Sequence, residues 1–314
     1  MKKLRAFISI IAVIAIISVM FSGCSLFSKK ESSKSDESSH AQITTSVAED
    51  VIAPEDVTWN GDMFEAINNG GLLNILLIGQ DRRPDEGRQR SDCMILCSLN
   101  PETKELSMIS FLRDLYVQIP GHSDNRLNAA YVYGGFDLIK ETLEHNFGVT
   151  VDGCLEVDFD SFEQIVDIVG GVDIELTSAE AEIVGSGATE GLYHLNGAQA
   201  LTYTRIRKID SDFQRTARQR TLLNAVFSKM KGCTLTELMT LVSEILPLMT
   251  TDMSEEELMS FAFNLASSLS ELKIENYGVP SSGNYQNATI NGMAVLVPDL
   301  YEIKKLIFEE YLPV

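Results

Sequence analysis

The stretch CMILCSLNPETKELSMISF, residues 93–111, decides the fold class of this chain. Two apolar runs, 93–99 and 105–111, flank a turn signal of proline and polar residues, which predicts a β-hairpin. Just upstream, LLNILLIG at 72–79 is a continuous apolar run that ends in glycine. Such a run is typical of a strand that is buried on both faces.

Extended and helical patterns alternate along the rest of the chain. Further strands are predicted at 115–120, 154–159, 172–176 and 276–280, and helices at 62–68, 136–147, 161–169, 196–203, 212–231, 234–247, 254–270 and 298–311. This alternation predicts an α/β or α+β fold, in which a mixed central β-sheet is flanked by helices. We see no internal repeat.

The N-terminus has the character of a membrane segment. Positions 6–23 carry no charge and follow a basic start, so residues 1–24 are expected to be a signal anchor or a lipoprotein signal. Phe21 to Cys24 resembles a lipobox with Cys24 as the lipidated residue, although phenylalanine replaces the usual aliphatic residue. Both alternatives place the remaining chain outside the cytoplasm.

Residues 25–56 are rich in serine, lysine and acids, so we expect a disordered linker there. The folded domain is then predicted to span 57–314. The net charge of −20 argues against general binding of nucleic acid, whose phosphates attract basic surfaces. Cys93, Cys97, Cys154 and Cys233 permit disulfides, but we favour buried free thiols because Cys93 and Cys97 share one apolar run.

Arginine is distributed unevenly. Beyond Arg5, the eleven arginines lie in two windows, 82–126 and 205–220, and the intervening and following sequence uses lysine. The same windows contain Asp81, Asp92, Asp114, Asp210 and Asp212. Arginine offers a rigid donor fork that matches phosphate oxygens, and Mg²⁺ prefers carboxylates together with phosphate. Structural salt bridges are the alternative for any single aspartate, but the two clusters together predict an anion and metal site.

Spacing refines the second window. In a helix that starts near Asp212, Arg215 and Arg218 share a face, whereas Arg220 lies well round from both and is expected at the solvent. Arg205 and Arg207 alternate, so an extended segment would direct both to the same side. His122, His145 and His194 are predicted to be surface residues.

Several motifs together resemble the LytR–CpsA–Psr family of cell-wall glycopolymer ligases. In order, they are LLIGQD with Arg83, RSD (90–92), NPET (100–103), SFLRD (110–114), RLNAAYVYGG (126–135), VDFDSFEQIVDIVGGVDIEL (157–176), LNGAQALTYTRIR (195–207) and DFQRTARQR (212–220). They lie within a motif core of 72–232. Leu112 and Ser211 depart from the usual proline and glycine, which affects loop shape more than charge.

The resemblance implies a phosphotransferase that moves a glycan-1-phosphate from a polyprenyl-pyrophosphate carrier to a peptidoglycan hydroxyl. By motif, the residues implied to contact the pyrophosphate are Arg83, Arg113, Arg205, Arg207, Arg215 and Arg218. Asp92 and Asp212 would hold Mg²⁺ or Mn²⁺, and Asp81, Asp92, Arg113 and Asp212 form the implied catalytic set. A long apolar pocket between sheet and helices would take the lipid tail, and Tyr131 and Tyr133 either line it or pack in the core.

The implied partners are the polyprenyl-pyrophosphate-linked glycan, peptidoglycan and membrane lipid, with no nucleic acid. The expected location is the outer face of the cell membrane of a Gram-positive bacterium. The glycan, teichoic acid or another polymer, is not specified by the residues. Two alternatives stay open: a pyrophosphatase that acts on the same lipid-linked substrate, and a non-catalytic polyprenyl-phosphate-binding envelope protein.

Overall fold

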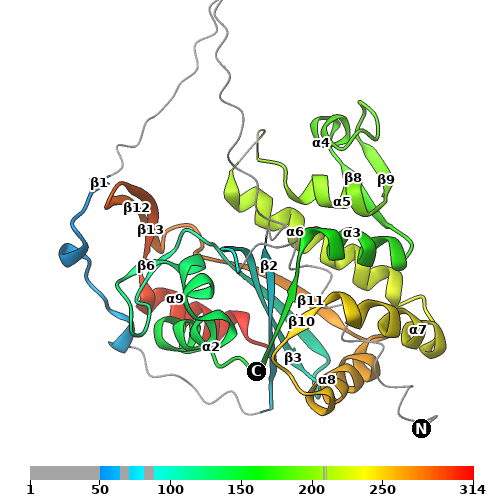
Figure 1. Ribbon diagram of the computed structural model, residues 1–314, viewed down its shortest axis with the longest axis horizontal. Helices are drawn as coiled ribbons and strands as arrows, with labels where there is room; N and C mark the ends of the chain where they lie inside the picture. Colours follow the sequence, from blue (N-terminus) through cyan, green and yellow to red (C-terminus); the bar gives the residue numbers. More distant parts are fainter. Residues whose placement is uncertain (1–49, 64–70, 81–87, 208, 210) are drawn as a thin grey trace, which may run out of the picture.

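The computed structural model describes residues 50–63, 71–80, 88–207, 209 and 211–314. Its centre is a mixed sheet with the strand order β10-β7-β2-β3-β4-β11 (Figure 1). These strands are β2 (Leu73–Gln80), β3 (Ser91–Asn100), β4 (Glu105–Phe111), β7 (Gly153–Val157), β10 (Thr250–Thr251) and β11 (Lys273–Val279). The predicted hairpin is confirmed, since β3 and β4 pair antiparallel, whereas β2 pairs parallel with β7.

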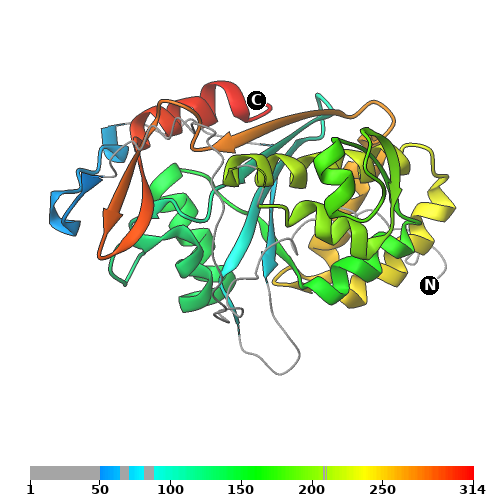
Figure 2. The same ribbon diagram turned by 90° about the horizontal axis from the view of Figure 1, so that it is seen from above.

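Helices cover both faces of this sheet (Figure 2). One face carries α2 (Leu127–Phe147) and α9 (Leu300–Leu306); the other carries α3 (Phe159–Ile168), α5 (Gly197–Thr204), α6 (Asp212–Met230), α7 (Leu235–Ile245) and α8 (Glu255–Ser268). Successive residues of β2 alternate between the two cores: Ile75 and Leu77 join one, Leu76 and Ile78 the other. Each such side chain contributes about 1.5–3 kcal/mol on burial, which explains the continuous apolar run. The predicted mixed sheet flanked by helices is confirmed.

Three small sheets lie outside the central one in the described part of the chain. The predicted strand at 172–176 exists as β8 (Val172–Leu176), but it pairs with β9 (Gly191–Leu195) in a separate hairpin beside α4 (Ser178–Ile183). β12 (Tyr285–Ile290) and β13 (Met293–Pro298) form a second hairpin that the sequence did not predict. β5 (Tyr116–Val117) and β6 (Asn125–Arg126) form a short pair, so the strand expected at 115–120 is shorter than predicted.

The linker predicted for residues 25–56 ends earlier than expected. β1 (Asp50–Val51) pairs parallel with β12, and residues 54–56 form a 3-10 turn, so the prediction of disorder is wrong for 50–56. Order there comes from hydrogen bonds to a strand more than 200 residues away, which local composition cannot reveal. Residues 25–49 and the expected membrane segment at 1–24, with Cys24, lie outside the described residues. Within the described part, no helix is long and apolar enough to span a membrane.

The described cysteines are free thiols, and Cys93 and Cys97 are buried, as their shared apolar run predicted; Cys154 is buried as well. Cys233 is half-buried. α2 begins nine residues before the predicted helix and is interrupted at Gly135, whose φ of 66° is left-handed. This φ is the reason that glycine is favoured here, since the guanidinium of Arg88, which a Cβ would meet, is the far end of a flexible side chain and can move aside.

Candidate functional site

Four chain segments meet at one end of the central sheet. Because β3 and β4 are antiparallel, the start of β3 and the end of β4 lie at the same edge, which brings Asp92 beside Arg113. The segment after α5 carries Arg207 to the same place, and α6 begins there with Asp212. Two stretches that are far apart in the sequence, 92–113 and 207–212, therefore supply one charged cluster.

Asp92 lies at the centre of the cluster. Arg113 donates from Nη1 to Oδ1 of Asp92 at 2.9 Å, and Nη2 of Arg207 lies 3.6 Å from Oδ2 of the same carboxylate. Asp92 is 7% exposed, so these contacts are made in a region of low solvent access. Burial acts to lower the pKa of Arg113, but the neighbouring Asp92 and Asp114 outweigh it, and the net effect is a raised pKa.

Asp114 extends the cluster to a second arginine. Its Oδ2 lies 3.5 Å from Nε of Arg113, and its Oδ1 lies 3.3 Å from Nε of Arg126. Arg126 also donates to the carbonyl of Ala294 on β13, with Nε at 3.2 Å. The sheet that contains β12 and β13 is thus joined to the cluster through Arg126. Asp114 and Arg126 belong to the first arginine window, but the motifs implied no particular role for either.

Asp212 and Arg215 form a two-contact ion pair at the start of α6. Nη2 of Arg215 lies 2.7 Å from Oδ2 of Asp212, and Nη1 contacts the other carboxylate oxygen. Arg215 is fully buried, and burial lowers its pKa to about 10, so it stays charged at neutral pH. Burial also raises the pKa of Asp212, against the fields of Arg215 and Arg113. The pKa of Arg207 is lowered by burial and then by the adjacent Arg113.

The pKa values of Arg207 and Arg215 are lowered for one physical reason, which the carboxylates of Asp92 and Asp114 outweigh at Arg113. Several guanidinium groups are held close together at low solvent exposure, which disfavours their positive charge, and the N-terminal end of the long helix α6 adds a further positive potential. An anion with several oxygens, such as a diphosphate, would relieve this repulsion and accept donors from more than one arginine. The arrangement suits binding and neutralising such a group.

The remaining arginines of the second window take separate partners. Arg218 shares the inner side of α6 with Arg215, but its Nε lies 2.6 Å from Oε1 of Glu180 and its Nη1 donates to the carbonyl of Ile206 at 3.2 Å. Arg205 caps the C-terminus of α5, so it does not belong to an extended segment, and its guanidinium lies 4.3 Å from the ring centroid of Phe159.

The prediction that Arg220 faces solvent is wrong. Its Nη1 donates to Oγ of Ser110 at 2.8 Å, and burial lowers its pKa. α6 packs against the sheet along more than one face, so a position well round from Arg215 still meets β4. Asp81 and Arg83 lie outside the described residues and stay predictions.

Asp92 and Asp212 are the carboxylates that the sequence predicts as ligands of Mg²⁺, and in the structure each is paired with arginine. Among the described residues, no group of three or more His, Cys, Asp or Glu side chains is placed to hold a metal ion. Mg²⁺ differs from most protein-bound metals because it often takes only one or two carboxylates and completes its shell with water and phosphate. The donor set therefore fits a metal that arrives with a phosphate-bearing substrate.

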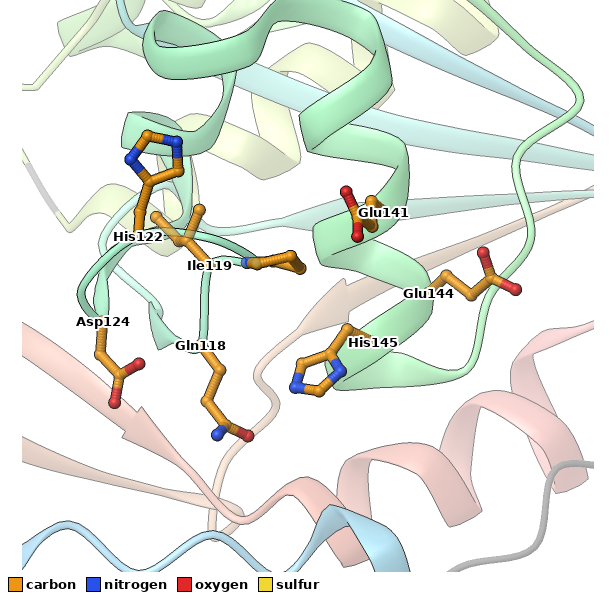
Figure 3. A pocket seen from close by; sticks show the side chains of 8 residues that line it. Gln118, Ile119, His122, Asp124, Glu141, Glu144 and His145 are labelled. Carbon is orange, nitrogen blue, oxygen red and sulfur yellow. The ribbon is translucent and has the colours of Figure 1, made fainter.

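A separate cavity of about 470 Å³ lies between the C-terminal half of α2 and the loop after β5. Figure 3 shows His145, Glu141 and Glu144 on the helix side and His122 and Asp124 on the loop side. His122, His145 and His194 are exposed, as predicted. None of the clustered arginines lines this cavity, so it is distinct from the charged cluster.

The chain has recognisable relatives among known proteins. The LytR_cpsA_psr family model matches residues 23–308. The polyisoprenyl-teichoic acid–peptidoglycan teichoic acid transferase TagU of Oceanobacillus iheyensis is 33% identical over 250 residues, which cover 74% of this chain and 73% of that protein. TagU of Bacillus anthracis is 36% identical over 173 residues, 54% of this chain and 56% of that protein. The match to this and similar relatives thus spans just over half of their length.

Solved structures agree in fold. B. subtilis TagV is 28% identical with a TM-score of 0.62, covering 78% of this chain and all (100%) of that one. TagT bound to LIIa-WTA is 25% identical with a TM-score of 0.62, covering 86% and 99%. Since the family model matches most of the chain and TagU of O. iheyensis aligns with nearly three quarters of it, this chain belongs to the LytR–CpsA–Psr family.

Proposed function

We propose that this chain transfers a glycan-1-phosphate from a polyprenyl-pyrophosphate carrier to a hydroxyl group of peptidoglycan. The observation that carries the proposal is the cluster of Arg113, Arg207 and Arg215 around Asp92 and Asp212 at the end of the sheet. Its relatives named as teichoic acid transferases and the structure of TagT bound to LIIa-WTA support the same class of donor. A teichoic acid is the polymer that these relatives favour.

In the proposed reaction, the oxygen of the acceptor hydroxyl attacks the phosphorus that bears the glycan. The bond from this phosphorus to the bridging oxygen breaks, polyprenyl phosphate leaves with the electron pair of that bond, and the proton of the hydroxyl is released to water. Phosphoryl transfer depends mainly on positioning and on neutralising oxygen charge. Arg113, Arg207 and Arg215 are buried or half-buried, so their hydrogen bonds to phosphate oxygens would be stronger than in water. Arg205, Arg218 and Arg83 remain proposed pyrophosphate contacts.

Mg²⁺ or Mn²⁺ is the proposed cofactor, with Asp92 and Asp212 as its protein ligands. When bound, the ion would offset the charge of the phosphate oxygens and help to align the two phosphates. The contacts between the arginines and the aspartates do not depend on the ion. Arg113 and Arg207 hold the carboxylate of Asp92 in place, and Arg215 does the same for Asp212.

Membrane attachment through residues 1–24 is part of the proposal. A donor whose tail lies in the bilayer must be met at its surface, and a tether on the outer face would hold the charged cluster there. Lipidation of Cys24 and an uncleaved helix are the two proposed forms of the anchor. Cys24→Ala, examined by fractionation and metabolic lipid labelling, would distinguish them, because only the lipidated form loses label.

The decisive experiment uses the full chain with a lipid-linked glycan and peptidoglycan oligomers. We expect a covalently joined product and stoichiometric release of polyprenyl phosphate, with Arg113→Ala and Asp212→Ala both inactive. Cleavage of the donor without a joined product would instead support the pyrophosphatase alternative. Binding of the donor without turnover by the unaltered chain would support the non-catalytic alternative.

A further inference from the structure

A second cavity, of about 410 Å³, lies between the N-terminal segment 52–60 and the β12–β13 hairpin. Figure 1 shows these two parts of the chain, from opposite ends of the sequence, at the same side of the molecule. Asn60 joins its walls, since Nδ2 of Asn60 donates to Oδ1 of Asp299 at 2.8 Å. The volume falls within the range of small-molecule sites, and the walls are fixed in advance by the fold.

The lining differs chemically from the charged cluster. Thr58, Asn284, Tyr285 and Gln286 offer hydroxyl and amide groups, and Asp56 and Asp299 add carboxylates. Among the described residues that line this cavity, none is lysine, arginine or histidine. A phosphate group would therefore be repelled here. Amides, hydroxyls and an aromatic ring are the groups that bind neutral polyhydroxylated compounds. The amides and hydroxyls both donate and accept hydrogen bonds, and the ring packs against C–H groups.

Asn284 points to a ligand that donates hydrogen bonds. It is only 6% exposed, and its Nδ2 donates to Oγ of Ser281 at 2.9 Å. Its Oδ1 is buried and has no hydrogen-bond partner among the described residues. Buried polar atoms are nearly always paired, since an unpaired acceptor loses solvation without compensation. A hydroxyl or amide N–H of a bound sugar would supply the donor once the side chain of Asn284 turned this oxygen toward the cavity.

The cavity adjoins the charged cluster by two routes. Tyr285 lines the cavity, and its ring centroid is 5.7 Å from that of Phe213, the residue after Asp212. The loop that leads to Asn284 follows β11, whose last residue Val279 accepts a hydrogen bond from the backbone N–H of Leu112 at 2.8 Å. Leu112 directly precedes Arg113. The lining residue Tyr285 thus connects the cavity to the start of α6, and the loop before Asn284 connects it to the end of β4.

We infer that this cavity is the subsite for the acceptor, and that it binds the neutral N-acetylated glycan of peptidoglycan rather than its peptide. The inference rests on the proposed function, which requires an acceptor hydroxyl near the pyrophosphate. Amide and hydroxyl groups match N-acetyl and hydroxyl groups of sugars. Because the cavity has carboxylates and no arginine, the diphosphate of the donor would bind at the arginine cluster and not here. Donor and acceptor would then occupy neighbouring sites, one positively charged and one neutral to acidic.

The test is a bulky substitution at the exposed wall residue, Thr58→Trp, in the full chain. Glu55→Trp is the matched control, because Glu55 is exposed in the same short segment but does not line the cavity. We expect Thr58→Trp to raise the KM for peptidoglycan oligomers by about tenfold or more, with the donor KM and acceptor-independent hydrolysis unchanged. Glu55→Trp should match the unaltered chain, and Asn284→Ala should weaken the acceptor in the same direction if it folds.

Direct binding separates this inference from the proposed function. A tetrasaccharide of N-acetylglucosamine should give saturation-transfer signals with the unaltered chain that Thr58→Trp abolishes, whereas a free stem pentapeptide should give none at this site. Glycan binding without any transfer activity would overturn the proposed function and leave the cavity as a glycan-binding site without the role of acceptor subsite. An unchanged acceptor KM in Thr58→Trp, or binding of the pentapeptide in place of the glycan, would overturn the inference.

Discussion

Nε of Arg218 lies 2.6 Å from Oε1 of Glu180, and this buried ion pair joins α6 to the short helix α4 outside the central sheet. The same guanidinium donates to the carbonyl of Ile206, the residue between Arg205 and Arg207. Arg218 therefore fixes the segment that delivers Arg207 to Asp92. The sequence predicted that Arg218 contacts the substrate. In the structure it also positions a second arginine, Arg207.

Glu180→Gln should lower the free energy of unfolding by about 3 kcal/mol, because a buried guanidinium loses the carboxylate that offsets its charge. Urea denaturation of the two proteins at pH 7 measures the difference. Glu182→Gln is the control, since Glu182 is an exposed residue of the same helix. Equal losses for the two variants would show that the pair contributes nothing specific.

The contribution of Glu180 should depend on pH. Although burial acts to raise its pKa, the hydrogen bonds from Arg218 and Thr177 outweigh it, and the pKa lies below the ordinary value of 4.5. A lowered folded pKa means that the stabilisation is complete above the unfolded pKa and is lost as the pH falls through the folded pKa. Unfolding measured from pH 7 to pH 3 should therefore show the unaltered chain and Glu180→Gln converging below about pH 4. A constant difference at all pH values would contradict this assignment.

Asp92→Asn should reduce the rate of transfer by about 100-fold, a loss typical of removing one preorganised charged group from such a site. The carboxylate that aligns Arg113 and Arg207 becomes a neutral amide, so both guanidiniums lose their orientation. Turnover with saturating donor is the measurement. Asp173→Asn is the charge-matched control, because Asp173 is exposed and paired with His194 on the separate β8–β9 hairpin. A similar rate in both variants would remove Asp92 from the catalytic set.

Arg215→Lys should weaken donor binding by about tenfold or more, although the charge is retained, because lysine lacks the planar fork that makes two contacts at once. Donor affinity, measured by competition with an unlabelled polyprenyl pyrophosphate, reports the effect. Arg220→Lys provides the comparison, since Arg220 is on the same helix but bonds Ser110 on β4. If Arg220→Lys loses donor affinity to the same extent, α6 as a whole and not Arg215 is responsible.

Removal of divalent metal should abolish transfer, and added Mg²⁺ or Mn²⁺ should restore it. Asp212→Asn should raise the Mg²⁺ concentration required for half-maximal activity by about tenfold, because one of two proposed carboxylate ligands is lost. Titrating the metal at fixed donor concentration measures this. Full activity in the presence of a chelator would show that the arginines alone neutralise the substrate.

The central hairpin could be predicted because its turn and both strands are adjacent in sequence and their apolar runs are continuous. The β12–β13 hairpin could not, since its strands are half-exposed and its third strand is β1 at the other end of the chain. Arg220 was misplaced for a related reason. Helical spacing gives the angle between side chains, but it does not say how much of the helix the sheet covers.

By itself, the sequence determined the buried strands, the mixed sheet flanked by helices, and the identity of the charged residues, because apolar periodicity and motif order are local properties. Only the tertiary structure decided which charges meet. It brought Asp92, Arg113 and Arg207 together, added Asp114 and Arg126, and gave Arg218 to Glu180. Those pairings depend on strand direction and helix packing, which set the distances between residues that are far apart along the chain.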